Sequence, residues 1–323
     1  MKEAAAGLNW GVERRLEFIE FRLFWEGGVN RSDIIEMFDL SVPQASKDLT
    51  LYQERAPQNA IYDKSAKRYV ASARFSPIFL KPDPDAYLSR MRAIAEGLTD
   101  PDDSWIAKPP QMDIALTPRR SVDPTVLRTI IGGIREHRSI EIHYLSMNRE
   151  RADPMWRRMT PHAFGYDGFR WHARAYCHLD HKFKDFLLPR ILEAGDMGAP
   201  GLGGDQDVLW QSTFDIVIGP HPRLTPGQRA VVAKDYGMTD ERVVLTVRYA
   251  MLFYVLKRLG LLGDASQLDP RSQHIVALNA VETAQALKRV EIDFDQIDRA
   301  PRIAGALESP KPAPTPKVDD RSK

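Results

Sequence analysis

Residues 169–177 read Phe-Arg-Trp-His-Ala-Arg-Ala-Tyr-Cys (FRWHARAYC), and apolar and polar side chains alternate along this stretch. Strict alternation predicts a β-strand with one buried face. The apolar face would carry Phe169, Trp171, Ala173, Ala175 and Cys177. The other face would carry Arg170, His172, Arg174 and Tyr176. This second face offers two guanidiniums, an imidazole and a phenol. The strand therefore raises the question of which part of the protein, or which ligand, covers it.

The segments around this strand predict one helix followed by a small, mostly antiparallel sheet or barrel. The helix would begin at Asp123-Pro124, a capping residue followed by proline at the first helical position. The β-like segments are SIEIHYLS (139–146), RRMTPHAFGYDG (157–168) and FKDFLLPRIL (183–192). The dipeptide Asp167-Gly168 is a strong hairpin signal. We therefore expect residues 121–194 to form a separate sheet domain.

The first 80 residues predict three helices and a basic hairpin, the order of a winged helix-turn-helix. Helices are expected over 12–26 and 30–38, and a third follows in LSVPQASKDLTLYQE (40–54). Ser41 and Gln44 match a capping box at its start, and Ala45, Leu49 and Tyr52 recur at the spacing of a buried stripe. Two short strands, 61–62 and 69–70, would be joined by a polar turn.

The third helix and the hairpin supply a candidate DNA-contact set. Small polar side chains can approach base edges in the major groove, and cations can hold phosphates. The set is Ser41, Gln44, Ala45, Ser46, Lys47, Thr50, Lys64, Lys67 and Arg68. The alternative is the solvated face of a structural helical domain, which the balance of eleven cations and eleven anions in residues 1–80 favours.

Three further regions complete the expected organisation. Residues 81–120 are rich in proline and charge and predict a connector. The glycine-rich stretch AGDMGAPGLGGD (194–205) predicts a flexible joint. Beyond it, residues 206–300 predict a small α+β domain, in which residues 251–256 are apolar around most of a helix and suggest a dimer interface. The charged, proline-rich tail 308–323 is expected to be disordered.

Composition limits the classes of function. The 323 residues carry a net charge of +1, so any attraction for nucleic acid must be local. No apolar run is long enough for a transmembrane helix, and the N-terminus lacks a secretory pattern, so we expect a cytoplasmic protein. The single cysteine, Cys177, excludes an intramolecular disulfide and a multi-cysteine metal site. We expect no metal ion and no cofactor.

An enzyme is the alternative from another class. The histidines His143, His162, His172, His178 and His181 could serve a nuclease or phosphoesterase. The sequence has no HExxH motif, no glycine-rich phosphate loop and no acidic cluster at metal spacing. We therefore expect no catalytic activity. A structural DNA-bridging protein is a further alternative, which the lack of a response to any small ligand would favour.

The chain resembles the WYL-domain transcriptional regulators, and among them the CapW/BrxR group that controls anti-phage defence operons. The resemblance rests on residues 15–70, on IHYLS, RRMTPHAFGYDGFRWHARAYC and FKDFLLPRI, and on residues 218–238 and 247–261. Trp171-His172-Ala173 stands where many members have Trp-Tyr-Leu. The resemblance implies an α+β multidomain chain with a winged helix-turn-helix, an Sm- or SH3-like WYL β-barrel and a C-terminal WCX domain.

The resemblance also implies the partners and the ligand site. The protein would be a homodimer that binds double-stranded DNA at an inverted-repeat operator. A basic pocket would bind a nucleotide or oligonucleotide through Tyr144, Ser146, Arg157, His162, Arg174 and Arg190, and His172 lies on the same predicted polar face. Arginine forks match phosphate geometry. We expect a repressor that the ligand relieves; the alternatives are a ligand-activated activator and a solvated sheet face with no ligand.

Overall fold

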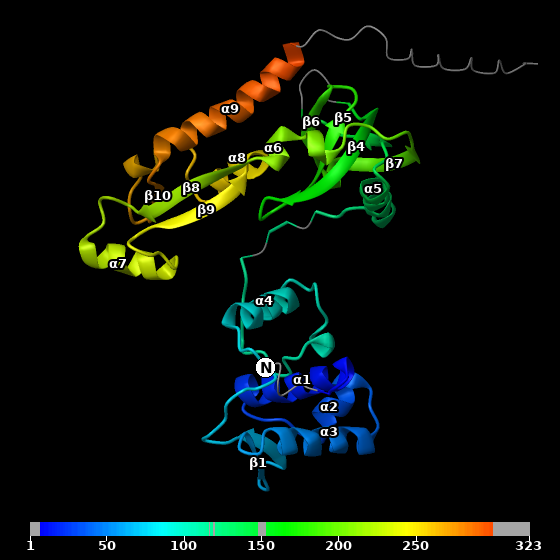
Figure 1. The fold of residues 1–323 in the computed structure, drawn as a ribbon, viewed down its shortest axis with the longest axis vertical. Coiled ribbons are helices and arrows are strands. Elements are labelled where there is room, and N and C mark those ends of the chain that lie inside the picture. The colour runs from blue at the N-terminus through cyan, green and yellow to red at the C-terminus, as the bar shows by residue number, and fades with distance from the viewer. Residues whose placement is uncertain (1–6, 116, 119, 148–152, 300–323) are drawn as a thin grey trace, which may run out of the picture. The chain divides into compact units, whose positions relative to one another are not determined.

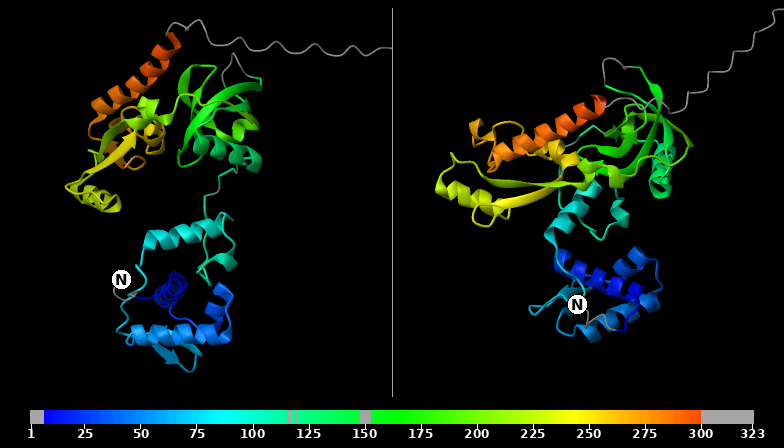
Figure 2. Two further views of the ribbon diagram at one scale, coloured as in Figure 1. Left: turned by 45° about the vertical axis from the view of Figure 1, so that its right-hand side comes forward. Right: turned by 45° about the horizontal axis from the view of Figure 1, so that its top comes forward.

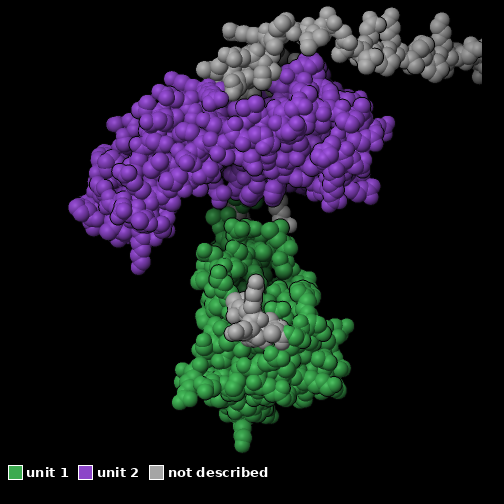
Figure 3. Space-filling view, in the orientation of Figure 1, with its two compact units in different colours: residues 1–118 green, residues 119–323 purple. Residues whose placement is uncertain are grey.

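The computed structural model describes residues 7–115, 117–118, 120–147 and 153–299 (Figure 1). The chain divides into two compact units, residues 1–118 and 119–323 (Figure 3). Among the described residues, no helix combines the length and the apolar composition that crossing a bilayer requires.

The first unit is a winged helix domain followed by a short helical segment. Its elements are α1 (Trp10–Glu26), α2 (Arg31–Phe38), α3 (Val42–Arg55), the antiparallel strands β1 (Ala60–Asp63) and β2 (Arg68–Ala71), α4 (Pro84–Ala95) and the 3-10 turn η1 (Pro101–Asp103). Asn9, Asn30 and Ser41 cap the first three helices by accepting backbone N–H bonds. The predicted stripe of Ala45, Leu49 and Tyr52 is buried. The predicted winged helix is confirmed.

The carboxylate of Glu20 on α1 organises the interior of this unit. Glu20 is completely buried. Its two oxygens accept hydrogen bonds from the backbone N–H groups of Ile78, Phe79 and Leu80 at 2.7–3.0 Å. The Tyr52 hydroxyl and the Asn59 amide also donate to it, at 3.2 and 3.3 Å. One side chain thus satisfies three buried backbone donors of the segment that leaves the wing.

The second unit begins with a helix and a five-stranded antiparallel sheet. The helix α5 spans Pro124–Glu136. The strands are β3 (Ile140–Tyr144), β4 (Met155–Tyr166), β5 (Trp171–Cys177), β6 (Lys182–Leu187) and β7 (Ile191–Met197), in the order β6-β5-β4-β3-β7, with the 3-10 turn η3 (Leu188–Arg190) before β7. A bulge at His162 interrupts the pairing of β4 with β5. Apolar side chains of α5 and the sheet form one core cluster.

The central strand β5 departs from the expected half-buried pattern. Ala173, Ala175 and Cys177 are completely buried, as predicted. Trp171 is the first residue of β5, and Phe169 precedes the strand. Both side chains are exposed. On the opposite face Arg174 is only 1% exposed and His172 only 5%. The strand is therefore buried on both faces over its central part.

The rest of the second unit is a smaller α+β domain. It contains η4 (Gly204–Gln206), α6 (Val208–Gln211), β8 (Thr213–Pro220), α7 (Pro226–Asp235), β9 (Val243–Arg248), α8 (Tyr249–Arg258), η5 (Ala265–Gln267), β10 (Ile275–Ala277) and α9 (Ala280–Arg299). Its sheet has the order β10-β8-β9, so β9 is an edge strand. Figures 1 and 2 show β8 and β9 as a long ribbon with α7 at its far end.

Two expectations about this region are corrected. Residues 194–197 belong to β7 and pair with β3, so the glycine-rich joint begins later than the sequence suggested. In α8, Leu252 and Leu256 are completely buried in the domain's own core, and Tyr254 hydrogen-bonds to the larger sheet. Only Phe253 in the stretch 251–256 is exposed. The apolar residues of α8 thus pack mostly within the chain, and they are not evidence for a partner surface.

Glu20→Ala tests the role of the buried carboxylate. The substitution leaves three buried backbone N–H groups without an acceptor, so we expect the free energy of unfolding of the first unit to fall by roughly 3–5 kcal/mol. Urea unfolding of the full chain measures the change. The control is Glu17→Ala on the same helix, which removes a partly exposed pair with Arg14 and should cost less than about 1 kcal/mol. Equal losses in the two variants would contradict the assigned role.

Candidate nucleic-acid interface and ligand site

The exposed face of α3 and the wing carry most of the predicted DNA-contact residues. Ser41, Lys47 and Thr50 are exposed, and Gln44 and Ser46 are half-buried. The Ser46 hydroxyl donates to the carbonyl of Val42 at 2.9 Å. In the wing, Lys64 and Lys67 are exposed in the turn between β1 and β2. Neither lysine forms an ion pair with any residue that the structure describes, and both side chains are exposed to solvent.

One member of the predicted DNA-contact set is wrong, and a second is partly engaged within the domain. Ala45 is completely buried in the helical core and cannot reach a base. Arg68 is half-buried and donates from Nη2 to the carbonyls of Gly28 and Glu26, so its guanidinium closes the wing onto α1. The expected capping box is half formed, because Ser41 accepts from the Gln44 backbone N–H while the Gln44 amide donates to Asp48 at 3.0 Å.

Sequence reasoning also missed a cation at this surface. Arg31 is exposed at the start of α2, and its Nη1 donates to the Ser46 hydroxyl at 3.0 Å. This bond places the Arg31 guanidinium beside the exposed face of α3. The available signal was an arginine directly after the Asn30 cap, on the helix that precedes α3.

The polar face of β5 is covered by acidic side chains. Arg174 donates from Nε and Nη2 to the two oxygens of Asp207, at 2.7 and 3.1 Å, and from Nη1 to Asp185 at 3.3 Å. Burial alone would lower the pKa of Arg174, but the hydrogen bonds and charges of these carboxylates outweigh it and raise the pKa. Arg174 was the expected phosphate clamp, yet in this structure carboxylates hold its guanidinium.

Histidines complete this buried cluster. His162 Nε2 lies 3.0 Å from Asp207 Oδ2, and the ring contacts Phe183 and Trp210 edge-on. Burial would raise the pKa of Asp207, but the His162 hydrogen bond and then Arg174 lower it to about 2. Asp207 caps α6 by accepting from the Trp210 N–H at 3.2 Å. The cluster therefore joins the sheet to the first helix after the joint.

A second contact ties the same face to α8. His172 Nε2 lies 3.2 Å from Asp167 Oδ2, and its ring centroid lies 5.0 Å from that of Tyr254. The Tyr254 hydroxyl donates to Asp185 at 3.0 Å. Burial and the charge of Asp185 raise the pKa of Tyr254 well above its usual range, so it stays a donor. His172, predicted as a ligand residue, is thus part of the packing between sheet and C-terminal domain.

The other predicted ligand residues lie on the opposite face or outside the cluster. Arg157 and Tyr144 lie on the core face of β4 and β3, with the guanidinium carbon 5.3 Å from the centre of the Tyr144 ring. The Tyr144 hydroxyl accepts from the Leu187 N–H at 3.2 Å. Ser146 and Arg190 are half-buried beyond the strand ends. Five of the seven residues therefore form two groups on two faces of one sheet, Ser146 and Arg190 lie beyond the strand ends, and the single pocket that was expected is not formed.

Arg157 differs from Arg174 in having no carboxylate partner among the residues that the structure describes. It is 5% exposed, and its Nε and Nη2 are buried without a hydrogen-bond partner. No ion pair joins it to any residue that the structure describes. A buried guanidinium with unused donors is costly unless an anion supplies the missing bonds. Of the predicted ligand residues, Arg157 is the one whose surroundings call for an external anion.

The structure also places the other histidine and cysteine side chains that were considered for catalysis or redox chemistry. The described residues contain no group of three or more His, Cys, Asp and Glu side chains placed to bind a metal ion. His178 forms a hydrogen bond of 2.8 Å with Thr160, and burial lowers its pKa. Cys177 is completely buried, and burial raises the pKa of its thiol, which disfavours the reactive thiolate.

Comparison with known families assigns all three domains. Residues 11–93 match the winged helix-turn-helix domain of the BrxR transcriptional regulator. Residues 125–195 match the WYL domain. Residues 213–283 match the C-terminal dimerization domain of the BrxR transcriptional regulator. The predicted fold class, a winged helix, a WYL domain built on a sheet and a small α+β C-terminal domain, is confirmed.

Curated relatives are similar along most of the chain. A DNA-binding transcriptional repressor CapW of Stenotrophomonas maltophilia is 38% identical over 87% of this chain and 94% of its own length. Proteins of the same name from Escherichia coli (strain KTE188) and Pseudomonas aeruginosa are 35% and 36% identical, over 88% and 85% of this chain and 94% and 92% of their own lengths. The chain therefore belongs to the CapW/BrxR family of WYL-domain transcriptional regulators.

Proposed function

We propose that this protein is a dimeric, sequence-specific DNA-binding repressor, and that a phosphate-bearing ligand weakens its binding to DNA. The observation that carries the DNA-binding part is the similarity to repressors named CapW, which extends through both the winged helix and the C-terminal domain. The exposed side chains of α3 and the wing support the same assignment. Regulation of a defence operon rests on the family resemblance alone.

The proposed DNA contacts fall into two kinds. Gln44 and Thr50 on α3 are suited to base edges, because amide and hydroxyl groups can form paired hydrogen bonds in the major groove. Lys47, Lys64, Lys67 and Arg31 would hold phosphates, which fixes the position of the helix without reading sequence. One helix reads few bases, so specificity requires two copies. A two-fold dimer would place the two helices about 34 Å apart, or a multiple of that distance, on an inverted repeat.

The proposed dimer interface is the outer edge of β9. The strand pairs only with β8, and its next three residues after Val243 are all exposed. Val244 is 55% exposed and Leu245 is 38% exposed. A free edge with apolar side chains invites pairing with another strand. We place the partner copy's β9 against this edge, inside the region that matches the family's dimerization domain.

The proposed ligand site is centred on Arg157. A phosphate oxygen could accept the bonds that Nε and Nη2 now lack, and the Tyr144 ring beside the guanidinium offers an aromatic face. Arg174 is a poorer anchor, because Asp207 and Asp185 already use its donors. The ligand relieves repression only if it binds more tightly to the conformation of the protein that cannot bind DNA. A coupling of ~1–3 kcal/mol would change operator affinity by roughly 5- to 150-fold.

Substitutions on α3 test DNA binding. Lys47→Ala should weaken binding to all sequences alike and reduce the salt dependence of log K by about one unit, while Gln44→Ala should relax preference at specific base pairs by ~1–3 kcal/mol. Fluorescence anisotropy with the DNA upstream of this protein's coding region, at several salt concentrations, measures both. Lys81→Ala, an exposed lysine beyond the wing, is the control. Equal affinity of the unmodified protein for this DNA and for random DNA would refute sequence-specific binding.

A charge on β9 tests the dimer. We expect Val244→Lys to raise the dimer dissociation constant at least about tenfold, because it places two like charges across the two-fold axis. Sedimentation velocity at micromolar concentrations measures the change, with Val281→Lys as the control on the 67% exposed position of α9. If Val281→Lys dissociates the dimer and Val244→Lys does not, the interface lies at α9 and the proposed β9 interface is wrong. Point substitutions are preferable to truncation here, because removing Asp207 would also strip Arg174 of its partner.

Substitutions of Arg157 and Arg174 distinguish a ligand-binding role from a structural role. Arg157→Met should leave the fold and the operator affinity intact and abolish release of DNA by a 5′-phosphorylated dinucleotide. Arg174→Met should lower the free energy of unfolding by roughly 3–5 kcal/mol, because it leaves Asp207 buried without its main counter-charge. Operator binding and urea unfolding, measured on both variants, give the comparison. Normal ligand release in Arg157→Met would remove Arg157 from the site, and tighter operator binding with ligand in the unmodified protein would indicate the opposite response.

A further inference from the structure

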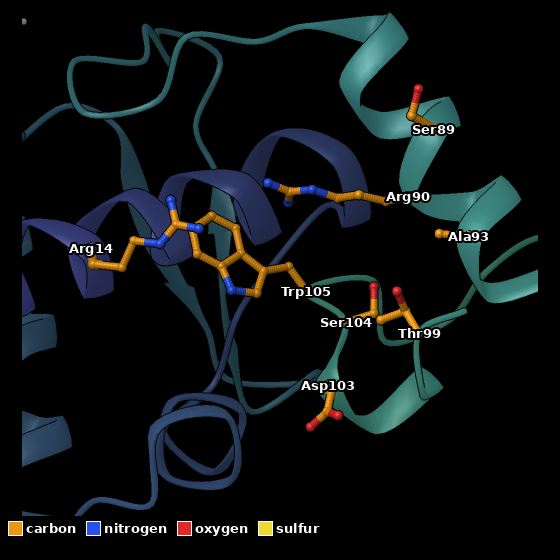
Figure 4. A pocket seen from close by; sticks show the side chains of 8 residues that line it. All are labelled: Arg14, Ser89, Arg90, Ala93, Thr99, Asp103, Ser104 and Trp105. Atoms are coloured by element: carbon orange, nitrogen blue, oxygen red, sulfur yellow. The ribbon is translucent and has the colours of Figure 1, made fainter. Parts of the chain in front are cut away.

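The first unit contains a cavity of about 360 Å³ between α1, α4 and the segment 99–105 (Figure 4). Its volume lies within the range typical of small-molecule sites. Arg14 from α1 and Arg90 from α4 converge on Trp105, as Figure 4 shows. Hydroxyl groups of Ser89, Thr99 and Ser104 add to the polar lining. Neither DNA recognition nor the WYL site uses this cavity.

Two guanidiniums share one indole ring in this cavity. The guanidinium carbon of Arg14 lies 4.0 Å from the Trp105 ring centre, and that of Arg90 lies 4.9 Å from it. Arg14 has a partner in Glu17, 2.7 Å away on the same helix. Arg90 has no hydrogen bond or ion pair with any residue in the described part of the chain; its recorded contacts are with the rings of Trp105 and Phe21.

The guanidinium of Arg90 therefore lies in this cavity without a paired carboxylate among the described residues. Burial lowers the pKa of Arg90 and the nearby charge of Arg14 lowers it further, while the charge of Glu17 offsets part of this change. The first two effects are unfavourable for the charged forms, and an anion between the two groups would offset them. Asp103 is the acidic residue of the lining and is exposed. The charge of Glu17 offsets that of Arg14, with which it pairs, so Arg90 is the lining guanidinium that no carboxylate in the described part of the chain pairs.

We propose that this cavity binds a small phosphate-bearing molecule, with its phosphate between Arg90 and Arg14. Guanidinium forks match phosphate oxygens, and the serine and threonine hydroxyls can donate further hydrogen bonds. The phosphate does not come from the DNA backbone, because α1 lies between α4 and α3 within this unit in every view of Figures 1 and 2. DNA bound to α3 would meet the opposite side of α1. A bound phosphate would tie α4 to α1, two elements of the DNA-reading unit.

The test is phosphate binding by the full chain carrying Arg157→Met, which silences the site proposed in the WYL domain. Isothermal titration with inorganic phosphate and with adenosine 5′-monophosphate, at constant ionic strength set by chloride, measures affinity. We expect saturable binding that Arg90→Met weakens at least about tenfold. Arg92→Met is the matched control, because Arg92 lies on the same helix with its side chain 67% exposed, and it should change the affinity less than about twofold.

Further variants keep the outcome decisive. Arg90→Lys retains the charge and loses the fork, so its affinity should fall between those of the parent and of Arg90→Met. Arg14→Met removes the second guanidinium and should weaken binding as well, which covers the case in which Arg90→Met fails to fold. Absence of saturable binding by the parent at millimolar phosphate, or equal losses in Arg90→Met and Arg92→Met, would overturn the proposal. DNA binding is measured separately and does not enter this test.

Discussion

The buried ion pair between Arg174 and Asp207 is the interaction on which the second unit depends. Both side chains are 1% exposed. Taking two charges out of water costs several kcal/mol for each ion, so the pair is tolerable only with nearly complete hydrogen bonding. That condition is met, because both oxygens of Asp207 accept from Arg174 and one of them also meets His162. Since Asp207 begins α6, satisfying Arg174 also fixes the start of the C-terminal domain against the sheet.

Arg157 on the neighbouring strand β4 also buries a guanidinium, but its surroundings differ from those of Arg174. It is nearly as buried as Arg174, yet no described carboxylate reaches its Nε or Nη2. Two arginines of equal intrinsic charge thus differ in their partners and hardly differ in their burial. A charge that folding leaves uncompensated reduces stability unless something outside the chain compensates it. That difference is why the ligand proposal rests on Arg157, although its position in the sequence is less conspicuous than that of Arg174.

The sequence predicted the local structure well because local rules decide it. The cap at Ser41, the buried stripe of the third helix and the alternation in 171–177 each depend on residues a few positions apart. The covering of the polar strand face could not be predicted in this way, because Asp207 lies 33 residues from Arg174 in a stretch that looked like a joint. Alternation indicates that a strand has two kinds of face, but it does not indicate what packs on either. The same local patterns predicted the winged helix and the sheet domain, and the family resemblance added the identification of the WYL and C-terminal domains.

The same distinction between paired and unpaired charge explains how a neutral domain can present a cationic surface. Residues 1–80 hold equal numbers of cations and anions, which favoured a structural role when counted alone. In the fold, Arg15 pairs with Asp48, and Arg22 with Glu26 and Asp33, so these cations and their acids cancel inside the helical core. Lys47, Lys64 and Lys67 stand exposed on α3 and the wing. Affinity for a polyanion follows from the cations that remain available at one face, because each phosphate contact releases its own counterions.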